Sequence, residues 1–204
     1  DLQSIGRLVD RWDAIGHGRP VWMVLQEFSW HKAKAGRERL YPSYHESRFM
    51  AYDAIAHGAR GILYWGTQTI DDPLFRESLY AMTSELSQLE PFLVNADKTV
   101  EVAVIDDLFD PPGVGVRGML KRNQEDYLLI LVNEDNHRHL GVDVTELETL
   151  NGRTLHLLYG DEKVIVRKGG VVIRMQPYEV KVFCTNPRFE TMRTIGRDYV
   201  DAGK

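Results

Sequence analysis

The sequence predicts a chain in two parts: an α/β part with parallel strands, then an all-β part folded as an antiparallel β-sandwich. All four tryptophans lie within the first 65 residues, whereas the glycine-punctuated apolar segments lie after residue 98. The spacing of apolar residues also changes there, from the helical period to the strand period of two. We therefore expect a first domain over 1–95, a sandwich over 96–186, and a tail or linker over 187–204.

The first part begins with a predicted helix and a predicted strand. Apolar residues recur at helical spacing from Ile5 to Ile15, and the pattern stops at the breakers Gly16 to Pro20. The next segment, VWMVLQEF from Val21 to Phe28, is a nearly continuous apolar run of strand length. Such a run is typical of a strand buried on both faces, as in a parallel sheet covered by helices.

Two further helices and one strand follow in alternation. Ser43 and Glu46 have the spacing of a capping box, which predicts a helix that ends near Gly58. The apolar segment from Gly61 to Trp65 predicts the second strand, and the order strand, helix, strand predicts a parallel pair. Asp72 and Pro73 then supply a helix cap and a first-turn proline. We expect Pro91 to stop this third helix.

Beyond residue 98 the pattern indicates about eight short strands, a number typical of an antiparallel sandwich. The segment from Tyr127 to Val132 reads as a fully buried strand, because every residue in it is apolar. Asn151-Gly152 and Gly169-Gly170 are expected to form hairpin turns, since these residues adopt positive φ at little cost.

Composition excludes several classes of protein. The 204 residues, 43% of them apolar, carry a net charge of −5. Neither half is basic, so no nucleic-acid partner is expected. The longest apolar run is far shorter than the roughly 20 residues that span a bilayer, and no membrane partner is expected. The single Cys184 cannot form an internal disulfide. The cellular compartment of the protein stays unknown.

The first part resembles a known family in two segments. These are RPVWMVLQEFSW and YPSYHESRFMAYDAIAHGARGILYWGTQT. They look like the seventh and eighth βα units of (β/α)₈-barrel glycoside hydrolases, most nearly the bacterial β-galactosidase type and its uncharacterised relatives. The later strands, ending in PYEVKVF, resemble the C-terminal β-sandwich appended to many such barrels. The resemblance implies the last βα units of a TIM-type barrel, incomplete in this chain, because a full barrel has eight strands.

Glycoside hydrolysis usually needs two carboxyl groups. The resemblance places the general acid upstream of this chain and the nucleophile at the end of the first strand, where Glu27 is the only carboxylate. Strand alternation leaves an alternative open, because Gln26 and Glu27 point to opposite faces. If Gln26 faces inward, the nucleophile is lost and the protein binds sugar without cleaving it. An ordinary charged residue at a strand end is the third interpretation of Glu27.

Other side chains near the two strand ends are candidates for contact with a substrate. Barrel enzymes build their sites at this end of the strands, and flat indoles there can stack on a sugar ring. The candidates that join Gln26 in binding are Trp30, His31, Tyr41, Trp65 and Asp71. Packing beneath the loops is the alternative role for the tryptophans. No metal site is expected, because His31 and His45 would need a third ligand from elsewhere and no HExxH-like spacing occurs. No cofactor is expected either, since Gly113-x-Gly115 lacks the third glycine of a dinucleotide-binding motif.

Three functions follow from these observations. The first is the C-terminal part of an enzyme that hydrolyses a β-linked glycoside with retention, inactive as this fragment alone. The second is a carbohydrate-binding module without chemistry, and the third is a structural fragment. In each case we expect a partner to cover the unpaired strand edge of the incomplete barrel. This partner is either the remainder of the barrel or a second copy of the chain.

Overall fold

The structure is a computed structural model that describes residues 2–29, 40–66, 68, 70–98, 100–105 and 115–189. The chain divides into two compact units, and the division falls between Glu85 and Leu86. Each unit is considered separately below.

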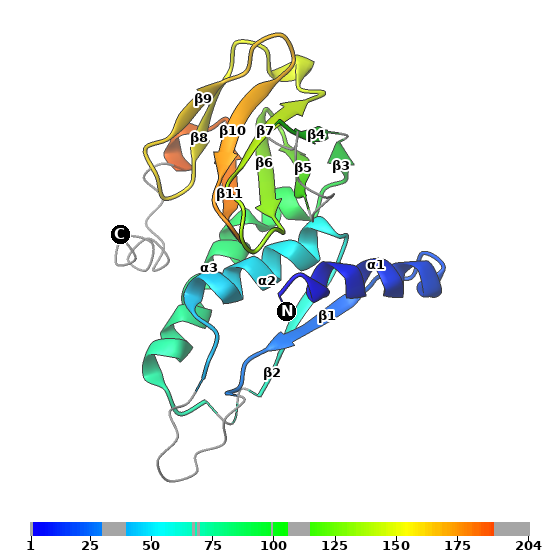
Figure 1. Cartoon of the computed structure of the whole chain (residues 1–204), viewed down its shortest axis with the longest axis vertical. Helices are drawn as coiled ribbons and strands as arrows, with labels where there is room; N and C mark the ends of the chain where they lie inside the picture. Colours follow the sequence, from blue (N-terminus) through cyan, green and yellow to red (C-terminus); the bar gives the residue numbers. More distant parts are fainter. Residues whose placement is uncertain are drawn as a thin grey trace. The chain divides into compact units, whose positions relative to one another are not determined.

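The first unit alternates helices and strands in the predicted order (Figure 1). Its elements are α1 (Ser4–Gly16), β1 (Trp22–Gln26), α2 (Tyr44–Ala56), β2 (Gly61–Trp65) and the first part of α3 (Pro73–Leu93). The strands β1 and β2 pair in parallel, with Trp22 opposite Gly61 and Gln26 opposite Trp65. The carboxyl ends of both strands therefore lie at the same edge, as the strand–helix–strand order predicts.

Both predicted helix starts are confirmed. The Ser43 hydroxyl accepts a hydrogen bond from the Glu46 amide at 3.2 Å, and the Glu46 carboxylate accepts one from the Ser43 amide at 2.8 Å. At the start of α3, the Asp72 carboxylate accepts from the amides of Leu74 and Phe75. These bonds satisfy amides that have no partner inside a helix, which fixes where each helix begins.

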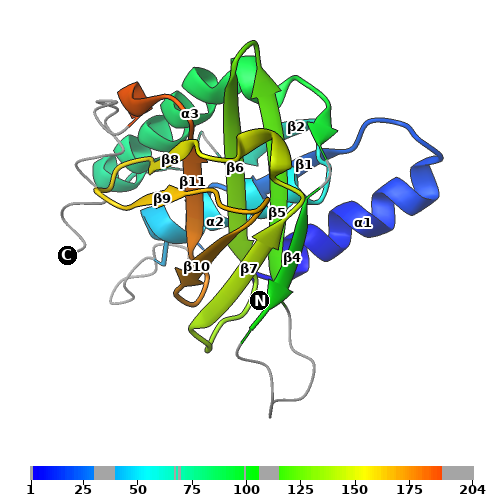
Figure 2. The ribbon, with the colours of Figure 1, turned by 90° about the horizontal axis from the view of Figure 1, so that it is seen from above.

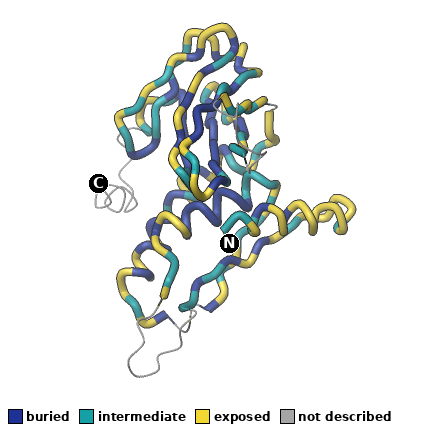
Figure 3. The backbone as a smooth tube through the Cα atoms, viewed as in Figure 1, coloured by how far each residue is buried: buried dark blue, intermediate teal, exposed yellow. Residues whose placement is uncertain are grey.

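The prediction that the first strand is buried on both faces was wrong. Met23 and Leu25 are buried, whereas Trp22 and Val24 are 60% and 51% exposed. The alternation along β1 is visible in Figure 3. Within the described residues this face of β1 is therefore largely exposed, and it forms the open face of the parallel pair.

The prediction that Pro91 stops the third helix was also wrong, because α3 continues to Leu93. A proline this close to a helix end removes only one backbone bond, the one to the carbonyl of Ser87. The Asn95 side chain then caps the end by donating to the Pro91 carbonyl at 2.8 Å. Among the described helices, none is both long and apolar enough to cross a membrane.

The second unit holds two antiparallel sheets, which Figure 2 shows from above. The described strands are β3 (Asp97–Lys98), β4 (Glu101–Val104), β5 (Val116–Asn123), β6 (Asp126–Asn133), β7 (Leu140–Thr145), β8 (Thr154–Leu157), β9 (Lys163–Ile165), β10 (Val171–Met175) and β11 (Val180–Cys184). One sheet has the order β10-β7-β4 and the other the order β3-β5-β6-β11-β8-β9. Short 3₁₀ turns lie at Glu148–Leu150 and Pro187–Phe189.

One hydrophobic core joins the two sheets of this unit. Leu129 and Leu131 of β6 and Phe183 of β11 belong to the larger sheet, while Val142 of β7 and Ile173 of β10 belong to the smaller one. All five side chains are almost completely buried. The prediction of a buried strand over Tyr127 to Val132 is confirmed by β6. Apolar burial between the layers is therefore the main stabilising interaction of the unit.

The predicted turns of the second part are only partly correct. Lys168 and Gly169 both have positive φ and lie between the bridged residues Arg167 and Gly170, which makes a tight hairpin turn one residue earlier than expected. Asn151 and Gly152 form a turn after the 3₁₀ turn rather than between two paired strands. Only Gly152 has positive φ there, so the Asn-Gly dipeptide indicates a turn but does not determine which elements the turn connects.

Candidate functional site

The candidate site lies at the carboxyl ends of β1 and β2. Because Gln26 is directly opposite Trp65 in the parallel register, their side chains leave the same face of the sheet. The Trp65 side chain is 68% exposed, and Gln26 is half-buried. The Gln26 amide group donates to the Phe28 carbonyl at 2.7 Å, so that its side chain is held close to the strand end.

The two faces of β1 differ, and Gln26 and Glu27 belong to different ones. Tyr64 lies opposite Leu25, and its hydroxyl contacts the Met82 sulfur of α3 at 3.5 Å. Residues on the side of Leu25 and Tyr64 therefore face the helices. Glu27, two residues after Leu25, is only 7% exposed. Burial and alternation together put Glu27 on the helix-covered side, opposite to the open face.

Glu27 is closely surrounded by residues of β2 and by the glycine that follows this strand. Its amide donates to the Trp65 carbonyl at 3.0 Å, which extends the strand pairing by one residue. Burial raises the pKa of the nearby Tyr64 phenol, and the negative charge of Glu27 raises it further. Gly66 has φ of 111°, and a Cβ atom there would lie 2.9 Å from the Cβ of Phe28. A glycine is therefore required where β2 passes the Glu27 backbone.

Tyr41 and Asp71 are brought together although 30 residues separate them. The Tyr41 hydroxyl donates to the Asp71 carboxylate at 2.8 Å, and the Tyr41 ring stacks on Phe75 with 4.5 Å between centroids. Asp71 is exposed, while Tyr41 is half-buried. This pair thus fixes the segment after β2 against the segment before α2, and it leaves the carboxylate accessible to solvent.

Two predicted site residues, Trp30 and His31, lie outside the described residues. The described residues that flank this segment contact each other, since the Ser29 hydroxyl accepts from the Leu40 amide at 2.8 Å. Ser29 follows the end of β1 by three residues, so Leu40 also lies near that strand end.

Sequence reasoning missed a buried polar cluster between α2 and α3. Arg48 donates through Nε and Nη2 to the Glu85 carboxylate at 2.9 to 3.1 Å. The hydroxyls of Tyr52 and Tyr44 donate to the same carboxylate at 2.5 and 3.2 Å. Burial alone would lower the pKa of Arg48, but the charge of Glu85 keeps it above its ordinary value. All four groups are buried, so this cluster fixes how the two helices pack.

A sequence signal for this cluster was present. Tyr44, Arg48 and Tyr52 recur every fourth residue, which places them on one helix face. Glu85 falls between Met82 and Leu89, inside the apolar stripe of α3. A charged residue within an apolar stripe normally has a buried partner.

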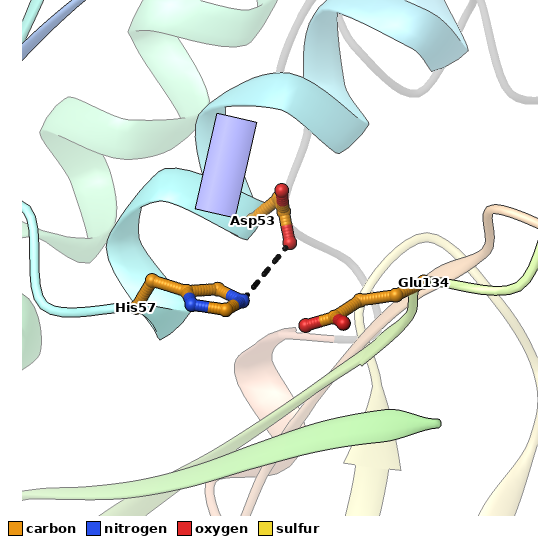
Figure 4. Close-up of side chains that lie close together, drawn as sticks. All are labelled: Asp53, His57 and Glu134. Carbon is orange, nitrogen blue, oxygen red and sulfur yellow. Dashed lines mark ion pairs between the residues drawn. The ribbon is translucent and has the colours of Figure 1, made fainter. Parts of the chain in front are cut away.

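A second missed cluster centres on His57 at the end of α2. Its Nδ1 atom lies 2.8 Å from the Asp10 carboxylate of α1, and its Nε2 atom lies 3.6 Å from the Asp53 carboxylate. Figure 4 shows the pair of Asp53 and His57. Asp53 also accepts from the Gly6 amide at 2.7 Å, and a Cβ atom at Gly6 would overlap the imidazole. The imidazole therefore links α1 to α2.

Neither unit, taken alone and over its described residues, brings three His, Cys, Asp or Glu side chains within metal-binding distance of one another. The pair of Asp53 and His57 offers two ligand atoms, fewer than the four that a structural zinc site uses.

Comparisons with known proteins show a likeness of fold. No family model matches the sequence, and no curated protein matches it. Among solved structures, the α-amylase of Geobacillus thermoleovorans, complexed with acarbose, has a TM-score of 0.53 at 14% identity. A protein described as a glycoside hydrolase has a TM-score of 0.51 at 15% identity. A family 5 glycoside hydrolase of Bacteroides vulgatus has a TM-score of 0.50 at 13% identity.

The three alignments cover 87%, 89% and 98% of this chain but only 42%, 45% and 50% of the respective structures. The chain thus spans at most half the length of the solved structures that it resembles. At such identities the likeness concerns the fold, which is similar to part of a glycoside hydrolase.

Proposed function

We propose that the chain is the C-terminal part of a glycoside hydrolase-like protein that binds carbohydrate at the face of Gln26 and Trp65 without cleaving it. In this proposal the first unit supplies the last βα units of a TIM-type barrel, and an appended β-sandwich follows. The observation that carries it is the alternation along β1: Gln26 lies on the open face, whereas Glu27 is buried on the helix-covered side. A neutral amide cannot replace the carboxylate of a retaining pair.

The chemistry of the open face suits a sugar. An exposed indole such as Trp65 offers a flat apolar surface to the C–H groups of a pyranose ring. The Gln26 amide carries both donors and an acceptor for hydroxyl groups. The Asp71 carboxylate, which accepts from Tyr41, is a further exposed acceptor in the segment that follows β2, although Tyr41 itself packs with Tyr64 on the helix-covered side. Such a combination of one aromatic surface and a few polar groups is typical of small-ligand sites.

The second candidate is an enzyme that hydrolyses a β-linked glycoside with retention, in which Glu27 is the nucleophile. In favour of this candidate, Glu27 directly follows β1, at the end of the strand where barrel enzymes place their catalytic groups. Its burial beside Tyr64 also provides a fixed environment for a carboxylate. The general acid would come from a strand that this chain does not contain.

Either candidate requires cover for the open face of the parallel pair. Trp22, Val24, Leu63 and Trp65 leave it and are all exposed. We propose the remainder of the barrel as the cover, because this chain spans at most half the length of the similar structures. A second copy of the chain is the alternative. Exposed apolar surface of this kind is normally covered in a soluble protein.

The experiment uses a protein in which the barrel is complete and compares three substitutions. Trp65→Ala and Gln26→Ala should each weaken carbohydrate binding at least tenfold, measured by calorimetry. Glu27→Gln should leave binding unchanged, because that side chain faces the helices. Trp12→Ala is the matched control, since Trp12 is also exposed but lies on α1.

Hydrolysis of an aryl β-glycoside distinguishes the two candidates. The binding proposal expects no turnover by the unmodified protein. Turnover that Glu27→Gln abolishes would establish the enzyme instead. If Trp65→Ala and Trp12→Ala alter binding equally, or if neither alters it, the site is not at the ends of β1 and β2.

A further inference from the structure

The second unit contains a cavity of about 560 Å³ beside the start of β7, the end of β10 and β11. Its polar lining consists of His139, Arg174, Gln176, Glu179 and Lys181. The volume lies within the range of about 300 to 1,000 Å³ that small-molecule sites occupy. All the lining residues belong to this one unit, so the cavity is independent of the Gln26 and Trp65 face.

The walls of the cavity are held by a buried asparagine. The Asn133 side-chain amide donates to the carbonyls of Gln176 and Arg138, at 2.7 and 3.2 Å. The Asn133 backbone amide donates to the Glu179 carbonyl at 2.9 Å. The connection between β6 and β7 is thereby tied to the connection between β10 and β11. A site held in this way loses little entropy when a ligand binds.

Asp135 fixes the turn that leads to His139. Its carboxylate accepts from the amides of His137 and Arg138 at 2.8 Å each and from the Arg138 side chain at 2.6 Å. Burial alone would raise the pKa of Asp135, but these hydrogen bonds and the charge of Arg138 hold it below its ordinary value. The charge of Arg138 is therefore neutralised by Asp135 within the turn, and Arg138 does not line the cavity.

Two cationic side chains and one carboxylate line the cavity. Lys181 is almost fully buried, and its ammonium pairs with Glu162 at 2.5 Å. The Arg174 side chain is exposed, and within the described residues its guanidinium has no hydrogen-bond or ion-pair partner. Glu179 supplies one carboxylate, which accepts from the Gln176 backbone amide at 2.7 Å. A guanidinium without an anionic partner in a chain of net charge −5 favours an anionic ligand.

We propose that this cavity binds a sugar acid, whose carboxylate pairs with Arg174 and whose hydroxyls bond to Gln176 and Glu179. The planar fork of an arginine matches a carboxylate in two parallel hydrogen bonds. The glutamine amide and the glutamate carboxylate provide donors and acceptors for hydroxyl groups. Leu140 and Met175 line the cavity as well and offer apolar contact to the C–H face of the ring. The proposal does not depend on the function proposed for the first unit.

The test titrates the ¹⁵N-labelled 204-residue chain with sodium D-glucuronate, D-glucose and D-glucose 6-phosphate while amide chemical shifts are recorded. Glucuronate should shift the amides of Gly141, Gln176 and Glu179 in a saturable manner, and glucose should not. Arg174→Gln should weaken glucuronate binding at least tenfold. Arg167→Gln removes the same charge from an exposed arginine outside the cavity and should leave binding unchanged.

The outcomes decide between the sources of the anionic group. Binding of glucose 6-phosphate without binding of glucuronate overturns the carboxylate assignment and indicates a phosphate ligand. Equal binding of glucose and glucuronate overturns the role of charge. Equal weakening by Arg174→Gln and Arg167→Gln, or the absence of saturable shifts with any of the three sugars, overturns the site.

Discussion

Replacing Glu85 by alanine tests the buried cluster that packs α2 against α3. The substitution removes the acceptor of Arg48, Tyr44 and Tyr52 together and leaves a buried guanidinium without its counter-charge. Removing one partner of a buried ion pair typically costs about 3 to 5 kcal/mol. The two phenols lose hydrogen bonds worth about 1 kcal/mol each, but these losses do not add fully because the groups share one carboxylate. We therefore expect a loss of about 3 to 5 kcal/mol.

Urea unfolding followed by tryptophan fluorescence measures this loss. All four tryptophans lie within residues 1–65, so the signal reports on the first unit. Asp13→Ala, which removes an exposed carboxylate from α1 of the same unit, is the control and should cost less than about 0.5 kcal/mol. The double variant Arg48→Met/Glu85→Leu should recover most of the stability, because it leaves no unpaired charge. A loss below about 1 kcal/mol in Glu85→Ala would refute the reasoning.

Three further predictions concern the first unit and use the same fluorescence assay. Gly66→Ala should cost at least about 2 kcal/mol, because the added Cβ meets Phe28 at positive φ, whereas Gly18→Ala, also at positive φ but in open space, should cost less. Gly6→Ala should cost about 1 to 3 kcal/mol, since the methyl group displaces the imidazole of His57; an unchanged midpoint would contradict the contact between α1 and α2. Because the folded-state pKa of Tyr64 is raised, its contribution to stability is complete below the unfolded pKa of about 10 and is lost as pH rises above it. Tyr64→Phe should make the stability curve flatter between pH 9 and pH 11, and identical curves would exclude the effect.

Local signals in the sequence predicted local structure well. The capping box of Ser43 and Glu46 needs only residues within one helical turn, and it defined the start of α2. The same holds for Asp72 at the start of α3. The parallel pairing of β1 and β2 followed from the order of elements, which brought Gln26 and Trp65 to one edge.

Features that depend on distant partners were harder to predict. The sequence of β1 is apolar on both faces, and only the fold reveals that the face of Trp22 has no cover in this unit. Glu85 lies 37 residues from Arg48, so that their pairing required knowledge of how α2 and α3 pack. The contact of Gly6 with His57 likewise depends on helix packing. A glycine has no side chain whose spacing in the sequence could indicate such a contact.

The hydrogen bond between Ser29 and Leu40 has a consequence for how this protein can vary. It joins the two described residues that flank residues 30–39, so these two positions lie close together. Lengthening a closed loop twofold costs only about 0.6 kcal/mol in chain entropy. Insertions and substitutions between these two residues can therefore accumulate at little cost to folding. Ser29 follows Gln26 by three residues, so such variation would begin close to the proposed ligand face and leave the described strands unchanged.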